Sequence, residues 1–243
     1  MIKVVLFDLG STLIHARIPW TDADFWRRGD AALVQVLRDE GFNLDVDAFD
    51  GEHGTFLDRY YARRKLGDTT EQTAFSMLTE LVFEKGFSNI PTKVLRAALD
   101  AMYTSMDGNW ILEEDAISTL ETLKIDGYRL GLISNTSDDP HVQRLIDAKG
   151  LRPFFEYVLT SAGFGIRKPD ARIFQAALDF FQVGPGASAM VGDTVDADVL
   201  GANEMGIYSI WIKRRSTRQN PNIIPKAIVE SLLEIPTLLR SLG

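Results

Sequence analysis

Downstream of about residue 110, short apolar runs alternate with segments of helical periodicity, and this alternation limits the possible folds more than any other feature. Each apolar run ends at a polar or small residue, as buried strands do. The expected strands are 129–134, 156–161, 187–193 and 207–212, and the N-terminal run 2–8 adds another. Strands that alternate with helices form right-handed βαβ units, so the sequence predicts an α/β fold with a doubly wound, Rossmann-like parallel sheet.

The segments between the expected strands carry apolar residues at a helical spacing. The helices predicted for this part of the chain are 114–127, 140–150, 170–182, 196–206 and, at the C-terminal end, 227–242.

The stretch from about 20 to 106 has a different pattern and contains no convincing strand. Four segments there have helical periodicity, and most of them end near a glycine. They are 22–41, 47–67, 70–86 and 92–106. We therefore expect two domains: an α/β core of residues 1–15 and 110–243, and a helical bundle of residues 16–109 inserted after the first strand as a cap.

The overall composition excludes several classes of partner. The chain has a net charge of −8 and no cysteine, and its pI is about 5.0. This balance disfavours nucleic acid and anionic membranes as partners, and the lack of cysteine excludes disulfides and thiolate chemistry. The chain enters a strand without a leader, and no apolar run approaches the ~20 residues of a membrane span, so we expect a cytoplasmic protein.

Polar residues follow the first two strands in positions that suit phosphoryl chemistry. Asp8 ends the run 2–8, and a carboxylate there can attack phosphorus. Taken alone, it favours an acid that caps the next turn. Ser134 and Asn135 follow a strand and precede a helix, where a hydroxyl and backbone N–H groups can bind phosphoryl oxygens. Plain helix capping is the alternative for this pair.

A lysine and a group of acids lie near the next two strands. Lys168 precedes a proline and can neutralise both Asp8 and a phosphoryl group; the alternative is a solvated loop lysine beside Arg167, which we expect at the surface. Three nearby acids, Asp193, Asp196 and Asp198, repel one another unless a hard cation lies among them. We expect Asp8 and Asp193 to bind Mg²⁺ directly, Asp198 to orient a water on it, and Asp196 to be an N-cap.

Together these segments resemble the motifs of the haloacid dehalogenase-like hydrolase superfamily, and the resemblance covers the whole chain. FDLGSTL is similar to the first motif, with Asp8 at the nucleophile. Ser134 and Lys168 fall on the second and third motifs, and GDTVDADVLGA is similar to the fourth. The resemblance implies a phosphatase with a C1-type helical cap, with Asp8, Asp193 and Asp198 binding Mg²⁺. Ser134, Asn135 and Lys168 then bind phosphate, and Lys168 is also catalytic.

One position departs from the family pattern. Most phosphatases of the family carry a second aspartate two residues after the nucleophile as general acid and base, whereas this chain has Gly10. General acid–base catalysis is worth ~10²–10⁴ in rate, so we expect slow turnover or a preference for acyl and aryl phosphates. The resemblance implies that the backbone carbonyl at this position is a metal ligand, which Gly10 still supplies.

The departure leaves several activities open. We expect a Mg²⁺-dependent phosphatase of small phosphorylated metabolites, acting through an aspartyl-phosphate as a monomer or homodimer. The alternatives are a 2-haloacid dehalogenase, a phosphonate-cleaving enzyme with Lys65 or Lys85 as its cap lysine, and a catalytically weak phosphate-binding or regulatory protein.

Overall fold

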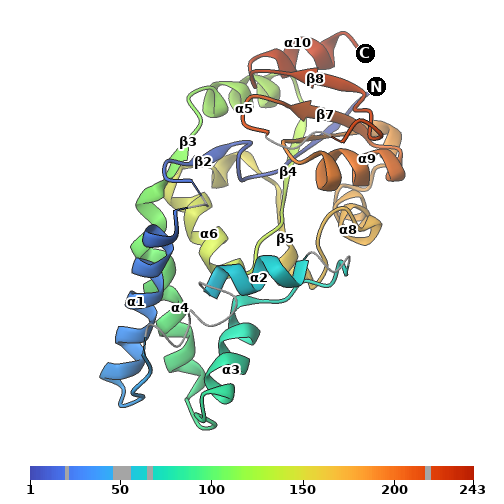
Figure 1. Cartoon of the computed structure of the whole chain (residues 1–243). Coiled ribbons are helices and arrows are strands. Elements are labelled where there is room, and N and C mark those ends of the chain that lie inside the picture. The colour runs from blue at the N-terminus through green and yellow to red at the C-terminus, as the bar shows by residue number, and fades with distance from the viewer. Residues whose placement is uncertain (20–21, 46–55, 65–67, 217–219) are drawn as a thin grey trace. The chain divides into compact units, whose positions relative to one another are not determined.

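The computed structural model describes residues 1–19, 22–45, 56–64, 68–216 and 220–243 (Figure 1). The chain divides into two compact units. Unit 1 contains residues 1–15 and 112–243, and unit 2 contains residues 16–111. None of the described helices is both long enough and apolar enough to cross a membrane.

Unit 1 is built on a six-stranded sheet in the order β5-β4-β1-β6-β7-β8, in which every pair is parallel. The strands are β1 (Val4–Phe7), β4 (Arg129–Ser134), β5 (Tyr157–Thr160), β6 (Ser188–Gly192), β7 (Tyr208–Ile212) and β8 (Ala227–Val229). All four residues of β1 are buried apolar side chains, as expected of a central strand covered on both faces. The predicted doubly wound α/β fold is therefore confirmed.

Helices flank this sheet (Figure 1). They are α5 (Ala116–Ile125), α6 (Asp139–Ala148), α7 (Ser161–Phe164), α8 (Ala171–Phe181), α9 (Leu200–Met205) and α10 (Glu234–Arg240). Short 3₁₀ turns occur at Arg152–Phe154 and Pro185–Ala187. Phe174 and Phe181 of α8 pack with Leu6 of β1 and Ile133 of β4 in one buried apolar cluster, so burial of an apolar helix face stabilises the sheet.

Two predicted helices differ from the structure. The tail 227–242 is not a single helix, because Ala227–Val229 pairs with β7 as the edge strand β8 and α10 begins only at Glu234. The Glu234 carboxylate accepts the N–H groups of Glu230 and Ser231 at 2.9 and 2.8 Å, which satisfies backbone donors ahead of the helix. The segment 196–206 begins with a π-helical turn, Val195–Val199, before α9.

The described part of unit 2 is mainly helical. Its helices are α1 (Ala23–Asp39), α2 (Phe56–Arg64), α3 (Ala74–Glu84) and α4 (Thr92–Met106), followed by a 3₁₀ turn at Asp107–Asn109. A Cβ at Gly29 of α1 would lie 2.9 Å from Met106 Sδ, so glycine permits close packing of α1 on α4. Lys85 is exposed after α3, and Lys65 lies outside the described residues.

The chain crosses between the units at two short strands that the sequence did not predict. These strands, β2 (Ile14–Ala16) and β3 (Trp110–Leu112), pair with each other in a two-stranded sheet. Each has only three residues, which is too short for a periodicity to be recognised in sequence. The role of residues 16–109 as a cap stays a prediction.

Candidate active site

Two acids follow neighbouring strands at the carboxyl edge of the sheet. Asp8 comes directly after β1, and Asp193 comes directly after β6. The parallel register pairs Phe7 with Val191, and the Asp8 N–H donates to the Val191 carbonyl at 2.9 Å. The two acids are therefore brought together by strand pairing alone, in the crevice where doubly wound sheets bind their ligands.

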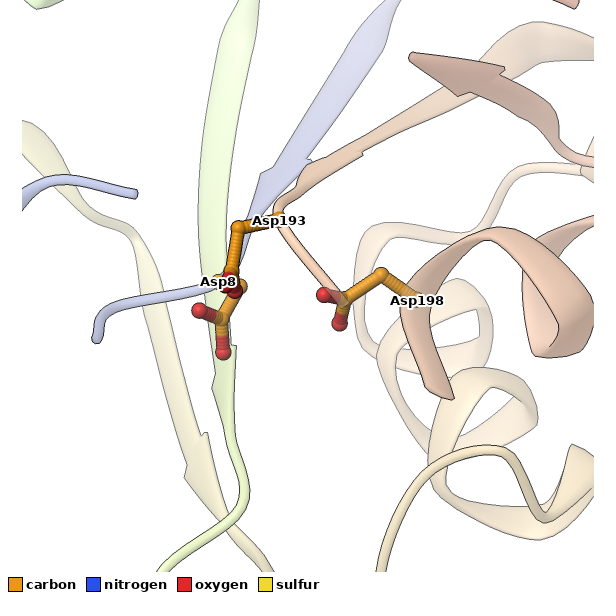
Figure 2. Close-up of side chains that lie close together, drawn as sticks. All are labelled: Asp8, Asp193 and Asp198. Carbon is orange, nitrogen blue, oxygen red and sulfur yellow. The ribbon is translucent and has the colours of Figure 1, made fainter. Parts of the chain in front are cut away.

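A third acid completes a carboxylate cluster. Asp198 lies in the π-helical turn after β6, and its side chain points back toward the ends of the strands (Figure 2). One carboxylate oxygen from each of Asp8, Asp193 and Asp198 lies within 4.8 Å of the other two. A Cβ at Gly192 would lie 2.3 Å from Asp198 Cγ, so only glycine at the end of β6 admits this approach.

Lys168 is the buried counter-ion of the cluster. Its Nζ lies 2.8 Å from Asp8 Oδ1 and 2.7 Å from Asp198 Oδ1, and it donates to the Ile133 carbonyl at 2.6 Å. Burial lowers the pKa of the ammonium, but the charges of Asp198 and Asp8 outweigh burial and hold this pKa above its usual range. The solvated alternative is therefore excluded, since Lys168 is only 2% exposed.

The neighbour of this lysine was misjudged from sequence. Arg167, expected at the surface, is buried at 7% exposure. A loop arginine is usually solvated. Here, however, the segment before α8 lies close to the carboxyl end of β4, where Lys168 donates to the Ile133 carbonyl.

Ser134 and Asn135 lie at the end of β4. Ser134 is the last residue of the strand and is 5% exposed. The Asn135 side-chain amide pairs with the backbone of Lys168: its Nδ2 donates to the Lys168 carbonyl at 2.9 Å, and its Oδ1 accepts the Lys168 N–H at 2.8 Å. The Asn135 side chain therefore fixes the backbone that carries the ammonium, while phosphate binding by Ser134 and Asn135 stays a prediction.

The acids outnumber the single ammonium, and their pKa values show the consequence. Burial, together with the charges of Asp8 and Asp198, raises the pKa of Asp193 to about 8. Burial also raises the pKa of Asp198 to about 6, with Asp8 adding to the rise and Lys168 opposing it. Three clustered carboxylates with excess negative charge fit a hard divalent cation such as Mg²⁺, which prefers oxygen ligands.

The turn after Asp8 has room at Gly10. A Cβ built on Gly10 meets no atom within 4 Å. Ser11 has φ 61°, and its N–H donates to the Ile14 carbonyl at 2.6 Å. A non-glycine residue in the left-handed region costs energy, which a surrounding fold must offset. Because a Cβ on Gly10 meets no neighbouring atom, the turn accommodates a side chain at position 10, although the sequence supplies none.

Two features of the turn after β6 were missed or misassigned. Asp196 is not an N-cap: Thr194 precedes the π-helical turn, and Asp196 Oδ1 instead accepts from Asn220 Nδ2 at 2.8 Å. Thr194 itself was missed. Its N–H donates to Asp198 Oδ2 at 2.9 Å and its hydroxyl to Asp193 Oδ1 at 3.2 Å. A threonine beside an acid was the available signal, because its short side chain readily hydrogen-bonds to neighbours.

A second group of charged residues, which ranges from the buried Glu113 to the exposed Arg215, lies elsewhere in unit 1. We call it the paired cluster: Glu113, Asp115, Arg214 and Arg215. Arg214 Nη1 donates to both oxygens of Asp115 at 2.8 and 2.7 Å, and Arg214 Nη2 donates to the Thr12 carbonyl at 3.2 Å. Arg215 pairs with Glu113 through two nitrogen donors. Burial raises the pKa of Asp115, but hydrogen bonds from Arg214 and Ser231 outweigh burial and hold this pKa below its usual range.

The fold and the acidic site at its carboxyl edge place the chain among the α/β enzymes. A family model described as haloacid dehalogenase-like hydrolase matches residues 2–206. A glyceraldehyde 3-phosphate phosphatase from Methanothermobacter thermautotrophicus is 30% identical over 241 residues, covering 93% of this chain and 92% of that protein. The chain belongs to the haloacid dehalogenase-like hydrolase family, as its motifs indicated.

Solved structures agree in fold. A 2-haloacid dehalogenase from Pseudomonas syringae pv. tomato DC3000 has a TM-score of 0.71 at 22% identity, with 100% of each chain covered. A haloacid dehalogenase-type phosphatase from Thermococcus onnurineus has a TM-score of 0.65 at 22% identity, with 98% of each chain covered. At this identity the two structures establish the architecture, and the chemistry is argued from the site.

Proposed function

We propose that the protein is a Mg²⁺-dependent phosphatase of small phosphorylated metabolites that transfers the phosphoryl group to Asp8. One observation carries the proposal: a single buried ammonium, Lys168, contacts Asp8 and Asp198 while three carboxylates converge. The relative that is similar over most of both chains and is named a glyceraldehyde 3-phosphate phosphatase supports the reaction type.

In the first half-reaction, an Asp8 carboxylate oxygen attacks phosphorus, the bond from phosphorus to the ester oxygen breaks, and the leaving group departs with the electron pair. In the second, water attacks the aspartyl-phosphate, phosphate leaves and Asp8 is regenerated. Lys168 neutralises charge on Asp8 and on the phosphoryl oxygens, and Ser134 and Asn135 bind those oxygens. Asp8, Asp193, Asp198 and the Gly10 carbonyl would hold Mg²⁺, which supplies positive charge to the phosphoryl group.

Gly10 sets the substrate preference in this proposal. A glycine supplies no side-chain group that protonates a departing alkoxide, and general acid catalysis is worth ~10²–10⁴. Leaving groups of low pKa need no such help, so acyl and aryl phosphates are turned over faster than alkyl esters. Residues 16–109 act as the cap that selects among them.

The proposal is tested by measuring phosphate release from acetyl phosphate, p-nitrophenyl phosphate and glyceraldehyde 3-phosphate, with Mg²⁺ and with EDTA. We expect turnover that requires Mg²⁺, is fastest on acetyl phosphate and is abolished by Asp8→Asn. Circular dichroism verifies that the variant is folded.

Each alternative has its own outcome in these assays. Release of halide from 2-haloacids without metal, with no phosphoester turnover, would replace the phosphatase by a dehalogenase. Phosphonate cleavage would indicate the phosphonate-cleaving alternative. Tight binding of inorganic phosphate without turnover would identify a binding protein.

A further inference from the structure

Trp211 contacts the acidic site from a neighbouring strand. It is the penultimate residue of β7, and the parallel register pairs it with Gly192, the residue before Asp193. Its indole Nε1–H donates to the Asp193 carbonyl at 2.9 Å, and the side chain is 7% exposed. A buried indole N–H generally requires a hydrogen-bond acceptor, and here the acceptor belongs to a residue of the acidic site.

The peptide unit between Asp193 and Thr194 is held at both of its polar groups. Trp211 donates to its carbonyl oxygen, and its N–H, which belongs to Thr194, donates to Asp198 Oδ2 at 2.9 Å. Because a peptide unit is planar and rigid, a rotation at one end moves the other. The indole therefore determines the direction in which this N–H meets Asp198, as well as the backbone from which the Asp193 side chain extends.

Packing fixes the indole itself. Trp211 forms a small apolar cluster with Val195 and Val199, which lie in the same turn as the acids, and Ile223 packs against the cluster. The ring therefore has a defined orientation before any ligand binds. Side chains fixed by packing and hydrogen bonds support a ligand site more accurately than mobile ones.

We propose that Trp211 is a positioning residue for the acidic site, which acts through the Asp193–Thr194 peptide to set the geometry of Asp193 and Asp198 for Mg²⁺. The part of this inference that concerns Mg²⁺ rests on the proposed function. The part that concerns the rigidity of residues 193–199 is independent of it.

The experiment compares Trp211→Phe, which retains an aromatic ring and removes the N–H donor, with Trp26→Phe. Trp26, in α1 of unit 2, is also 7% exposed, so the second variant is a matched control. Amide hydrogen exchange of residues 193–199 is measured in the metal-free proteins, and the Mg²⁺ dissociation constant is measured by calorimetry without substrate. Thermal unfolding of both variants verifies that they are folded.

We expect Trp211→Phe to accelerate exchange in the turn about tenfold, the fold-change that corresponds to the loss of one hydrogen bond. We also expect it to weaken Mg²⁺ binding about tenfold, the size typical of removing a supporting hydrogen bond at a metal site. Trp26→Phe leaves both quantities at the wild-type value. Exchange in Trp211→Phe within twofold of wild type would overturn the positioning role. A wild-type protein that binds no Mg²⁺ contradicts the proposed function instead, and the exchange comparison still decides the role of Trp211.

Discussion

Unit 1 contains two groups of charged residues that differ in their balance of positive and negative charge. In the paired cluster, two carboxylates face two guanidinium groups. In the acidic site, three carboxylates share one ammonium, that of Lys168. Charges of opposite sign that pair offset much of one another's desolvation cost, whereas an uncompensated buried charge of one sign is costly unless a ligand neutralises it.

The aspartates of the two groups show the difference directly. The pKa of Asp115 is lowered because the hydrogen bonds and charge of Arg214 outweigh burial, while burial and its acidic neighbours raise the pKa of Asp193 to about 8. The same residue type therefore favours folding in one group and opposes it in the other. The paired cluster therefore suits a structural role, whereas the excess charge of the acidic site suits the cation binding that we propose.

The largest expected effect comes from removing the ammonium of Lys168 from the acidic site. Lys168→Met leaves buried carboxylates without a counter-ion, so we expect a loss of about 3–5 kcal/mol of unfolding free energy in the metal-free protein. Phosphate release should fall by ~10²–10³-fold or more. Chemical denaturation and initial rates measure the two effects.

Arg215→Met is the control, because it removes one cation from the paired cluster. The side chain of Arg215 is 40% exposed. The loss of unfolding free energy in this variant should stay at about 1 kcal/mol. Equal losses in the two variants would contradict the distinction between the groups.

Neutralising one aspartate in each group should change stability in opposite directions. At pH 8 without metal, we expect Asp193→Asn to raise the unfolding free energy by about 1–3 kcal/mol, since a neutral amide replaces a carboxyl group whose ionised form is opposed by burial and by its acidic neighbours. Asp115→Asn should lower it by about 1–3 kcal/mol, because it weakens hydrogen bonds from Arg214, Ser231 and the Leu232 N–H. Urea denaturation with EDTA measures both, and shifts of the same sign would refute the comparison.

The pH dependence of metal-free stability follows from Asp193. Its folded pKa of about 8 exceeds the usual value of 3.8, so between these values the folded state binds more protons than the unfolded state. Stability from this group is therefore complete below about pH 4 and is lost as pH rises toward 8. We expect the unfolding free energy to decline over this range, and to decline less in Asp193→Asn. An identical pH profile in the variant would show that Asp193 ionises normally.

The smallest expected effect comes from adding an acid where there is room. Gly10→Asp meets no neighbouring atom at its Cβ, and the new carboxyl group can protonate a departing alkoxide. We expect hydrolysis of glyceraldehyde 3-phosphate to rise about tenfold, a modest part of what acid–base catalysis supplies, while the rate on acetyl phosphate stays unchanged. Gly10→Asn is the control of similar size, and an equal rise in both variants would exclude proton transfer as the cause.

The sequence predicted what depends on local pattern. The strands that end at or next to Asp8, Ser134 and Asp193 were recognisable because buried apolar runs stop at polar residues, and a parallel sheet brings such ends to one edge. The burial of Arg167 and the bond from Trp211 to Asp193 were not predictable, because they depend on which segments meet in space. The short edge strand β8 was missed for the same reason: its pairing with β7 outweighed the helical pattern of the tail.

The position of β1 in the sheet has a consequence for synthesis of the chain. This strand is synthesised well before its partners β4 and β6, which begin only at residues 129 and 188, and the Asp8–Lys168 contact spans 160 residues. Unit 2, which is continuous in sequence, can be complete before either partner exists. Contacts of such long range form late in folding. A nascent chain that stops before β6 therefore exposes an apolar strand edge, and ribosome-bound intermediates of this protein are expected to require protection from aggregation.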